Sequence, residues 1–221
     1  MRARAGYGAA MDVAILLFPN VNALDAVGPY EVLRHLPDAR LRFVAPVPGP
    51  QSTEDGALAL VADASFDDVT AADVLVVPGG RGEVAIRESE RALEWVRAID
   101  AASTWTTSVC TGSLILARAG LLAGRRATSH WTALETLRAL GAEPTEERVV
   151  VEGKIVTAAG VSSGIDMALW LAGQLASEEQ AKAIQLGIEY DPQPPFDSGS
   201  TTKAHPELVA RMFRASRFFV E

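Results

Sequence analysis

Two short, continuously apolar segments constrain the fold of this chain most strongly. Residues 12–18 read DVAILLF and residues 73–77 read DVLVV, without the alternation of apolar and polar side chains that a half-exposed strand shows. Such runs are typical of strands that are buried on both faces of a sheet. Segments of helical composition follow both runs, and strand-like and helical segments keep alternating along the 221 residues. This order predicts an α/β protein with a mainly parallel central sheet that helices cover on both faces.

The other elements follow from local composition and from residues that break regular structure. Pro29 fits only near a helix start, so the helix within 25–36 is expected to begin near Gly28. The Pro- and Gly-rich segment 46–55 is expected to be a loop, and 189–199 an extended tail. Further strands are expected at 40–45, 57–62, 105–109 and 127–131, a hairpin at 148–151 and 154–157, and helices at 88–101, 114–119, 132–140, 165–175, 178–188 and 206–220.

One edge of this sheet is expected to hold the functional site. Right-handed crossovers place the carboxyl ends of parallel strands along one edge, and such sheets bind ligands there. The loops after Phe18, after Val77 and at Cys110 belong to that edge and are rich in Gly and polar residues. With no sign of a domain boundary, residues 12–221 are expected to form a single domain, with residues 1–11 as a disordered extension.

Cys110 is the only cysteine, and it lies where a strand changes into a helix. Residues 105–109 are mostly β-branched or aromatic, whereas residues 114–119 are mostly good helix formers. A residue at such a turn projects from the sheet with a helix N-terminus behind it, which lowers a thiol pKa and favours the thiolate. The pattern predicts a nucleophile elbow built on sulfur. The alternative is an inert core cysteine, since free cysteines are often buried.

A thiolate nucleophile also needs an anion site and a proton donor. The backbone N–H groups of Gly79 and Gly80 can approach a ligand closely, and the N–H of Thr111 follows the nucleophile directly. These three residues are therefore the predicted anion site. A plain turn after a strand would also contain such glycines.

Two further side chains could take part in proton transfer. Asp25 precedes the first helix, where it is either a helix cap or a carboxyl group beside Cys110 whose pKa rises in a poorly solvated pocket. His130 is either the base of a Cys–His pair or a structural histidine. The residues alone leave both choices open.

Composition excludes several classes of protein. A single cysteine excludes an intrachain disulfide and a cysteine-based zinc cluster, and Cys110 with His130 makes no metal-ligand set, so no metal is expected. The net charge of −8 and the lack of basic runs argue against nucleic acid. No apolar run approaches the roughly 20 residues of a membrane span. The first ten residues lack the apolar stretch of a signal peptide, which favours the cytoplasm.

The segment 80–85 fits the dinucleotide-binding pattern GxGxxA. It follows a middle strand, and Asp100, at the position of the expected acidic residue, falls late in a helix. No nucleotide cofactor is therefore predicted.

Several short motifs occur together in this chain. They are LLFP at 16–19, LD at 24–25 with GP at 28–29, VPGG at 77–80, SVCTGSL at 108–114, AGLL at 119–122, ATSHW at 127–131, and a tail with EY, PPF and GS at 189–190, 194–196 and 199–200. Over about residues 12–200 the chain resembles the ThiJ/PfpI superfamily, relatives of the class I glutamine amidotransferases. Within it, the motifs are most similar to the isonitrile hydratase branch.

This resemblance implies a flavodoxin-like three-layer α/β/α sandwich that forms a homodimer. The resemblance implies that Cys110 is the nucleophile, that Asp25 is the acid beside it and that the hydroxyl of Thr111 assists. It further implies that Gly79 and Gly80 form the backbone part of the anion site and that His130 is the superfamily histidine. The implied reaction is the hydration of a small-molecule isonitrile to an N-substituted formamide, through a thioimidate on Cys110 and without a metal or organic cofactor.

Other functions remain open at this point. Glyoxalase or amidase chemistry could use the same cysteine, although Asp at position 25, where most of the superfamily has Glu, argues against it. A ligand-sensing module or a redox sensor is the non-enzymatic alternative. A fused helix-turn-helix domain is not expected, because only about twenty residues follow the tail.

Overall fold

The computed structural model of the protein describes residues 10–218. The strands are β1 (Met11–Leu16), β2 (Ala39–Ala45), β3 (Gly49–Ser52), β4 (Ala59–Ala62), β5 (Ala64–Ser65), β6 (Val74–Val77), β7 (Trp105–Val109), β8 (Arg126–Ala127), β9 (Glu143–Pro144), β10 (Val149–Glu152) and β11 (Ile155–Ala158). The helices are α1 (Ala23–Leu33), α2 (Glu83–Glu88), α3 (Glu90–Ala102), α4 (Gly112–Arg118), α5 (Leu134–Ala139), α6 (Ser163–Leu175), α7 (Glu178–Gly187) and α8 (Pro206–Arg214), with a 3-10 turn at Trp131–Ala133.

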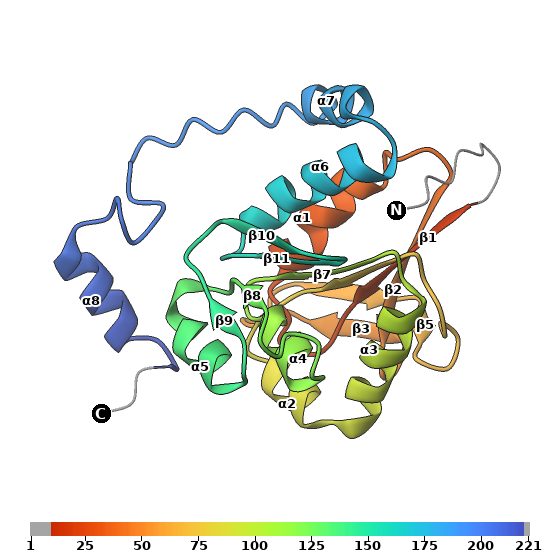
Figure 1. The fold of residues 1–221 in the computed structure, drawn as a ribbon, viewed down its shortest axis with the longest axis horizontal. Coiled ribbons are helices and arrows are strands. Elements are labelled where there is room, and N and C mark those ends of the chain that lie inside the picture. Colours follow the sequence, from red (N-terminus) through yellow and green to blue (C-terminus); the bar gives the residue numbers. More distant parts are fainter. Residues whose placement is uncertain (1–9, 219–221) are drawn as a thin grey trace.

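A central sheet of seven strands organises these elements, in the order β10-β11-β7-β6-β1-β2-β5. All neighbouring strands are parallel except the β10–β11 hairpin. Helices α1, α6 and α7 pack together on one face of the sheet, and α2 to α5 cover the other (Figure 1). The predicted flavodoxin-like three-layer sandwich is confirmed.

The two apolar runs form the middle of the sheet, as predicted. β1 and β6 are neighbours, and residues 13–18 and 74–77 are at most 1% exposed. Burying one Val, Leu or Ile side chain contributes about 1.5–3 kcal/mol to folding, so these strands supply much of the core energy. Both strands end at the edge where the predicted site residues lie.

The start of α1 differs from the prediction. The helix begins at Ala23 rather than near Gly28, and Pro29 lies inside it. Pro29 cannot donate to the carbonyl of Asp25, which removes one helical hydrogen bond. Packing between α1 and α6 offsets this loss, because the ring of Pro29 lies close to Gly164, which offers no side chain of its own. The earlier start places Asp25 in the first turn of the helix.

Other boundaries also differ. The expected loop 46–55 contains β3, which pairs with β4 in an antiparallel ladder. The hydrogen bonds of this ladder stabilise a strand despite its Pro and Gly content. The expected helix 88–101 corresponds to α3, which starts one residue after its N-cap, Ser89. The Ser89 side chain accepts the N–H of Ala92. An additional helix, α2, precedes α3. The expected strand 127–131 ends at Ala127.

The C-terminal part leaves the sandwich. Residues 191–200 are all exposed, and this extended segment runs from α7 to α8, near α5 (Figure 1). The helix expected at 206–220 ends at Arg214, and positions 219–220 lie outside the described residues. The expected extension 1–11 also lies outside them, apart from residues 10 and 11, and Met11 already belongs to β1.

Candidate functional site

Cys110 occupies the turn between β7 and α4 in a strained conformation. Its φ is +57°, a left-handed value that costs a residue with a Cβ about 1–2 kcal/mol. Its N–H donates to the carbonyls of Ala158 at 3.1 Å and Ala159 at 2.9 Å. Its carbonyl accepts the hydroxyl groups of Ser113 at 3.2 Å and Ser129 at 3.1 Å. These bonds hold the strained turn, so the predicted elbow geometry is present.

The Cys110 side chain lies beside the carboxyl group of Asp25, and the residue is only 5% exposed. Burial, followed by the negative charge of Asp25, raises the pKa of the thiol well above its usual value. The N–H groups of Thr111 and Val161 bond the sulfur and act in the opposite direction. The expected lowering of the thiol pKa by the following helix is therefore wrong, because burial outweighs the dipole of the seven-residue α4. The raised pKa favours the protonated thiol, and a thiolate forms only when a neighbouring group takes the proton.

Asp25 is the neighbour that can take this proton. Its side chain is completely buried, and Oδ2 accepts the N–H of Gly79 at 3.0 Å. Oδ1 is buried and has no hydrogen-bond partner of normal geometry among residues 10–218. Burial raises the pKa of Asp25 to about 7, although the Gly79 N–H and the Cys110 thiol lower it. Asp25 therefore exchanges its proton near neutrality, and its carboxyl faces the site rather than capping α1.

The loop at Gly79 and Gly80 holds the acid and the hydroxyl of the site. The N–H of Gly79 is bonded to Asp25, and the N–H of Gly80 donates to Thr111 Oγ1 at 3.0 Å. Both N–H groups are thus engaged by side chains in this structure. Direct anion binding by these two groups stays a prediction, while their hold on Asp25 and Thr111 is a structural fact.

Replacing Gly79 by alanine should damage the site and the fold together. A Cβ at this position would lie 2.5 Å from both the N and the Oγ1 of Thr111 and 3.0 Å from Asp25 Oδ2. We expect a loss of about 1–3 kcal/mol in the free energy of unfolding, measured by urea denaturation. Gly187→Ala in α7 is the matched control, because a Cβ there meets nothing within 4 Å. Equal stability of the two variants would contradict the close packing described for Gly79.

His130 lies near this site but bonds elsewhere. Its Nδ1 pairs with Thr132 Oγ1 at 2.7 Å, and its Cδ2 edge packs on Gly160, where a Cβ would lie 2.9 Å away. Among residues 10–218, no hydrogen bond joins His130 to Cys110. Burial, and then the charge of Arg217, lowers the pKa of His130, which favours the neutral ring. The role of His130 as a base stays a prediction.

Val161 also lies at the site, although no sequence motif marks it. Its φ is +31°, unusual for a β-branched residue, and its N–H bonds the sulfur of Cys110. It follows β11, which pairs with β7 in parallel. The rule that parallel strands end at one edge could therefore have identified it from the sequence. On the apolar side, Cys110 packs in a cluster that includes Met167.

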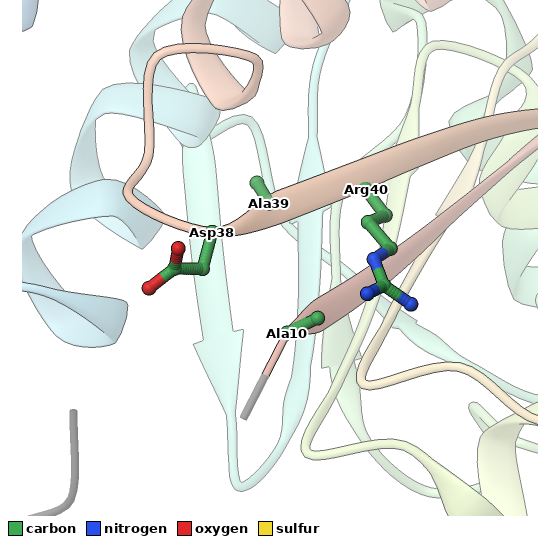
Figure 2. Close-up of a pocket in the computed structure, with 4 residues that line it drawn as sticks. All are labelled: Ala10, Asp38, Ala39 and Arg40. Carbon is green, nitrogen blue, oxygen red and sulfur yellow. The ribbon is translucent and has the colours of Figure 1, made fainter. Parts of the chain in front are cut away.

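A shallow hollow at the opposite edge of the sheet has no such chemistry. Figure 2 shows it lined by Ala10, Asp38, Ala39 and Arg40, at the amino ends of β1 and β2.

Within residues 10–218, no group of three or more His, Cys, Asp or Glu side chains could hold a metal ion. No helix in that range is long and apolar enough to cross a membrane.

Comparison with known proteins places this geometry in a family. Residues 11–174, which carry the site from Asp25 to Val161, match the DJ-1/PfpI family. The chain belongs to the DJ-1/PfpI family. The match includes the central sheet and helices α1 to α5, and it ends within α6. The extended segment and α8 therefore lie beyond the matched DJ-1/PfpI domain.

Individual DJ-1/PfpI relatives extend the similarity. The isonitrile hydratase of Pseudomonas putida is 44% identical over 200 residues, which cover 90% of this chain and 87% of that protein. A crystal structure of a ThiJ/PfpI family protein from Pseudomonas syringae superimposes with a TM-score of 0.90 at 37% identity, covering 94% of this chain and 86% of the other. The HTH-type transcriptional regulator CdhR of Pseudomonas aeruginosa is 29% identical over 82% of this chain but only 54% of its own length.

Proposed function

We propose that this DJ-1/PfpI chain hydrates isonitriles, R–NC, to N-substituted formamides. The observation that carries the proposal is the buried pair of Cys110 and Asp25 at the elbow. It occurs in a chain that is 44% identical to an isonitrile hydratase over 90% of its length. A carboxyl group with a pKa of about 7 beside a nucleophile is suited to move a proton in both directions near neutral pH.

The first step forms a bond between sulfur and carbon. Asp25 accepts the proton of the Cys110 thiol, and the resulting thiolate attacks the terminal carbon of the isonitrile. The attacked carbon then carries a negative charge, and Asp25 returns the proton to this carbon. The product is a covalent thioimidate, S–CH=N–R, and Asp25 is again a carboxylate. Thr111 and Val161 direct N–H groups at the sulfur and favour the thiolate form in this step.

The second step releases the product by adding water. Asp25 accepts a proton from the water molecule as its oxygen bonds to the thioimidate carbon and the C=N electron pair moves onto nitrogen, and Asp25 then passes that proton to the nitrogen. The tetrahedral adduct, S–CH(OH)–NH–R, then collapses. Asp25 takes the hydroxyl proton as the C=O bond forms, the C–S bond breaks with its electron pair on sulfur, and Asp25 returns the proton to give the Cys110 thiol. The overall change is R–NC plus water to R–NH–CHO, with Cys110 and Asp25 returned to their starting state.

Turnover of a simple isonitrile tests this proposal. Purified protein, reduced at Cys110, is incubated with cyclohexyl and phenyl isonitriles, and formamide is followed by chromatography. We expect one formamide per isonitrile consumed and repeated turnover. Absence of formamide from a folded, reduced protein would contradict the proposal. Methylglyoxal and a small amide, assayed in parallel, would then decide for or against the glyoxalase and amidase alternatives.

We also propose that the protein is a cytoplasmic homodimer and that residues 12–221 act as one domain. Three apolar side chains on and beside β3 and β4 are largely exposed, namely Val47 at 71%, Leu58 at 50% and Val61 at 61%. Such a group of exposed apolar side chains supports the homodimer, because a second copy of the chain could cover it. A free cysteine fits a reducing compartment. Light scattering checks the dimer, and a solution mass of 23.4 kDa, that of one chain, would contradict it. Cell fractionation checks the location.

A further inference from the structure

The peptide groups of the Gly79–Gly80 loop are held one after another by residues outside the loop. The Gly79 N–H is bonded to Asp25, and the Gly79 carbonyl accepts the N–H of Asn22 at 2.9 Å. The Gly80 N–H is bonded to Thr111 Oγ1. Gly80 has a φ of +121°, a backbone conformation that glycine tolerates and other residues rarely adopt.

The next peptide, between Gly80 and Arg81, is held at both ends by opposite charges. Its N–H donates to the carboxylate of Glu54 at 2.6 Å. Its carbonyl accepts Arg217 Nη2 at 3.3 Å, and Arg217 Nη1 reaches the following carbonyl, of Arg81, at 3.2 Å. A charged partner makes each of these bonds stronger than one between neutral groups.

Arg217 is itself fixed by a buried carboxylate. Its Nη2 lies 2.9 Å from Oε1 of Glu83, whose side chain has no exposed surface. Arg87 forms a second ion pair with Glu83, in which Arg87 Nε lies 3.0 Å from Glu83 Oε2. The two guanidinium groups offset part of the desolvation cost of this carboxylate, although burial still raises the pKa of Glu83, and the pairing holds Arg217 in place. The segment 190–205 and α8 bring Arg217 to this point from the far end of the chain.

The same bonds influence the hydroxyl of Thr111. A carbonyl oxygen has two lone pairs, and that of Gly80 accepts the N–H of Glu83 at 3.2 Å and the guanidinium of Arg217. The Thr111 hydroxyl lies 3.5 Å from this oxygen, at the limit of a hydrogen bond. Because this oxygen has two other donors, it holds the Thr111 hydroxyl only weakly.

We propose that Glu54 and Arg217 are positioning residues, which hold the Gly80–Arg81 peptide from both ends so that the loop aligns Asp25 and Thr111 with Cys110. We call this pair the loop clamp. Neither residue touches the thiol, and both come from outside the loop. The catalytic consequence rests on the proposed hydratase function, whereas the ordering of the loop does not.

Five variants of the full chain separate hydrogen bonding from charge. Arg217→Ala and Glu54→Ala remove each half of the loop clamp. Arg217→Lys keeps the charge but not the two-pronged contact. Glu54→Gln keeps an acceptor for the Arg81 N–H without the charge. Arg214→Ala is the matched control, because Arg214 is exposed at the end of α8 and makes no ion pair among residues 10–218.

Hydrogen–deuterium exchange of the peptide covering residues 78–83 reads loop order without any substrate. We expect both alanine variants to exchange about tenfold faster than wild type, with the control unchanged.

In turnover, we expect kcat to fall about tenfold in both alanine variants with KM within about twofold. Glu54→Gln should recover most of the rate lost in Glu54→Ala, and Arg217→Lys should lie between wild type and Arg217→Ala. The double alanine variant should be no worse than the poorer single variant, because both act on one peptide.

Three results would overturn the loop clamp. They are unchanged exchange in both alanine variants, a Glu54→Gln variant as impaired as Glu54→Ala, and fully additive losses in the double variant. If wild type does not hydrate isonitriles, the proposed function falls, and alkylation of Cys110 by iodoacetamide replaces turnover. Alkylation should then slow in both alanine variants, because a displaced Thr111 N–H no longer lowers the thiol pKa. Unchanged alkylation would overturn the catalytic consequence of the loop clamp.

Discussion

The Cys110→Ala variant is expected to hydrate isonitriles at less than about one-thousandth of the wild-type rate. No thioimidate can form without the sulfur, and the remaining N–H groups of Thr111 and Val161 would have no nucleophile to stabilise. Turnover of cyclohexyl isonitrile, followed by formamide production, measures this loss. Intact-mass spectrometry of wild type during turnover should also show an added mass equal to the isonitrile, and the variant should show none.

Cys110→Ser is the matched control for this loss. Serine keeps the left-handed backbone and a similar side-chain size, but its hydroxyl is a much weaker acid than a thiol and stays protonated. We expect it to be as inactive as Cys110→Ala, with an unfolding midpoint close to that of wild type. Substantial turnover in the alanine variant would show that the reaction does not pass through the cysteine. It would also remove the main support for the mechanism.

Asp25→Asn is expected to lower kcat by about a hundredfold to ten-thousandfold, because an amide cannot accept and return the thiol proton. The wild-type rate should depend on pH around 7, the region to which burial raises the pKa of Asp25. The variant should lose this dependence along with most of its rate. Steady-state rates from about pH 5 to pH 9 measure both effects. A variant with the same pH profile as wild type would rule out Asp25 as the proton carrier.

The same substitution should make the protein more stable at high pH. The pKa of Asp25 rises from 3.8 to about 7 on folding, so the folded state favours the protonated form. The free energy of unfolding of wild type therefore falls as the pH rises through this window, by up to about 4 kcal/mol for this group. Asparagine carries no charge and escapes this cost.

Urea denaturation of both proteins checks this expectation. The stability of Asp25→Asn relative to wild type should grow between about pH 4 and pH 8 and then level off. A constant difference across this range would show that the Asp25 pKa is not raised in the folded state. Higher stability with lost activity would identify the buried carboxyl as a group kept for the reaction at the expense of the fold.

Much of the architecture could be predicted from local patterns. The apolar runs at 12–18 and 73–77 lie in buried central strands, and the small residues around Cys110 form the expected elbow. The start of α1 could not be predicted from Pro29, because packing against Gly164 decides whether an internal proline is tolerated. Strand β3 likewise depends on its partner β4 more than on its own composition.

The candidate site was only partly predictable. The rule for parallel strands brings Asp25, the Gly79 loop and Cys110 to one edge, and the structure places them in contact. The direction of the thiol pKa was predicted incorrectly, since the dipole of a following helix can be read from the sequence but the depth of burial cannot. The loop clamp was not foreseen, because its partners lie 27 and 137 residues apart from the loop positions that they bind.

The sequence by itself determined the sheet, the order of its strands along the chain and the residue that can act as a nucleophile. These properties depend on periodicity, side-chain shape and residue type within short segments, which a sequence displays directly. Only the tertiary structure decided which acid lies beside Cys110 and in which direction burial shifts the pKa of each group. It also decided that Arg217, near the end of the chain, supports a loop 137 residues earlier. Desolvation and charge pairing depend on distances in space, so the folded chain was needed to reveal them.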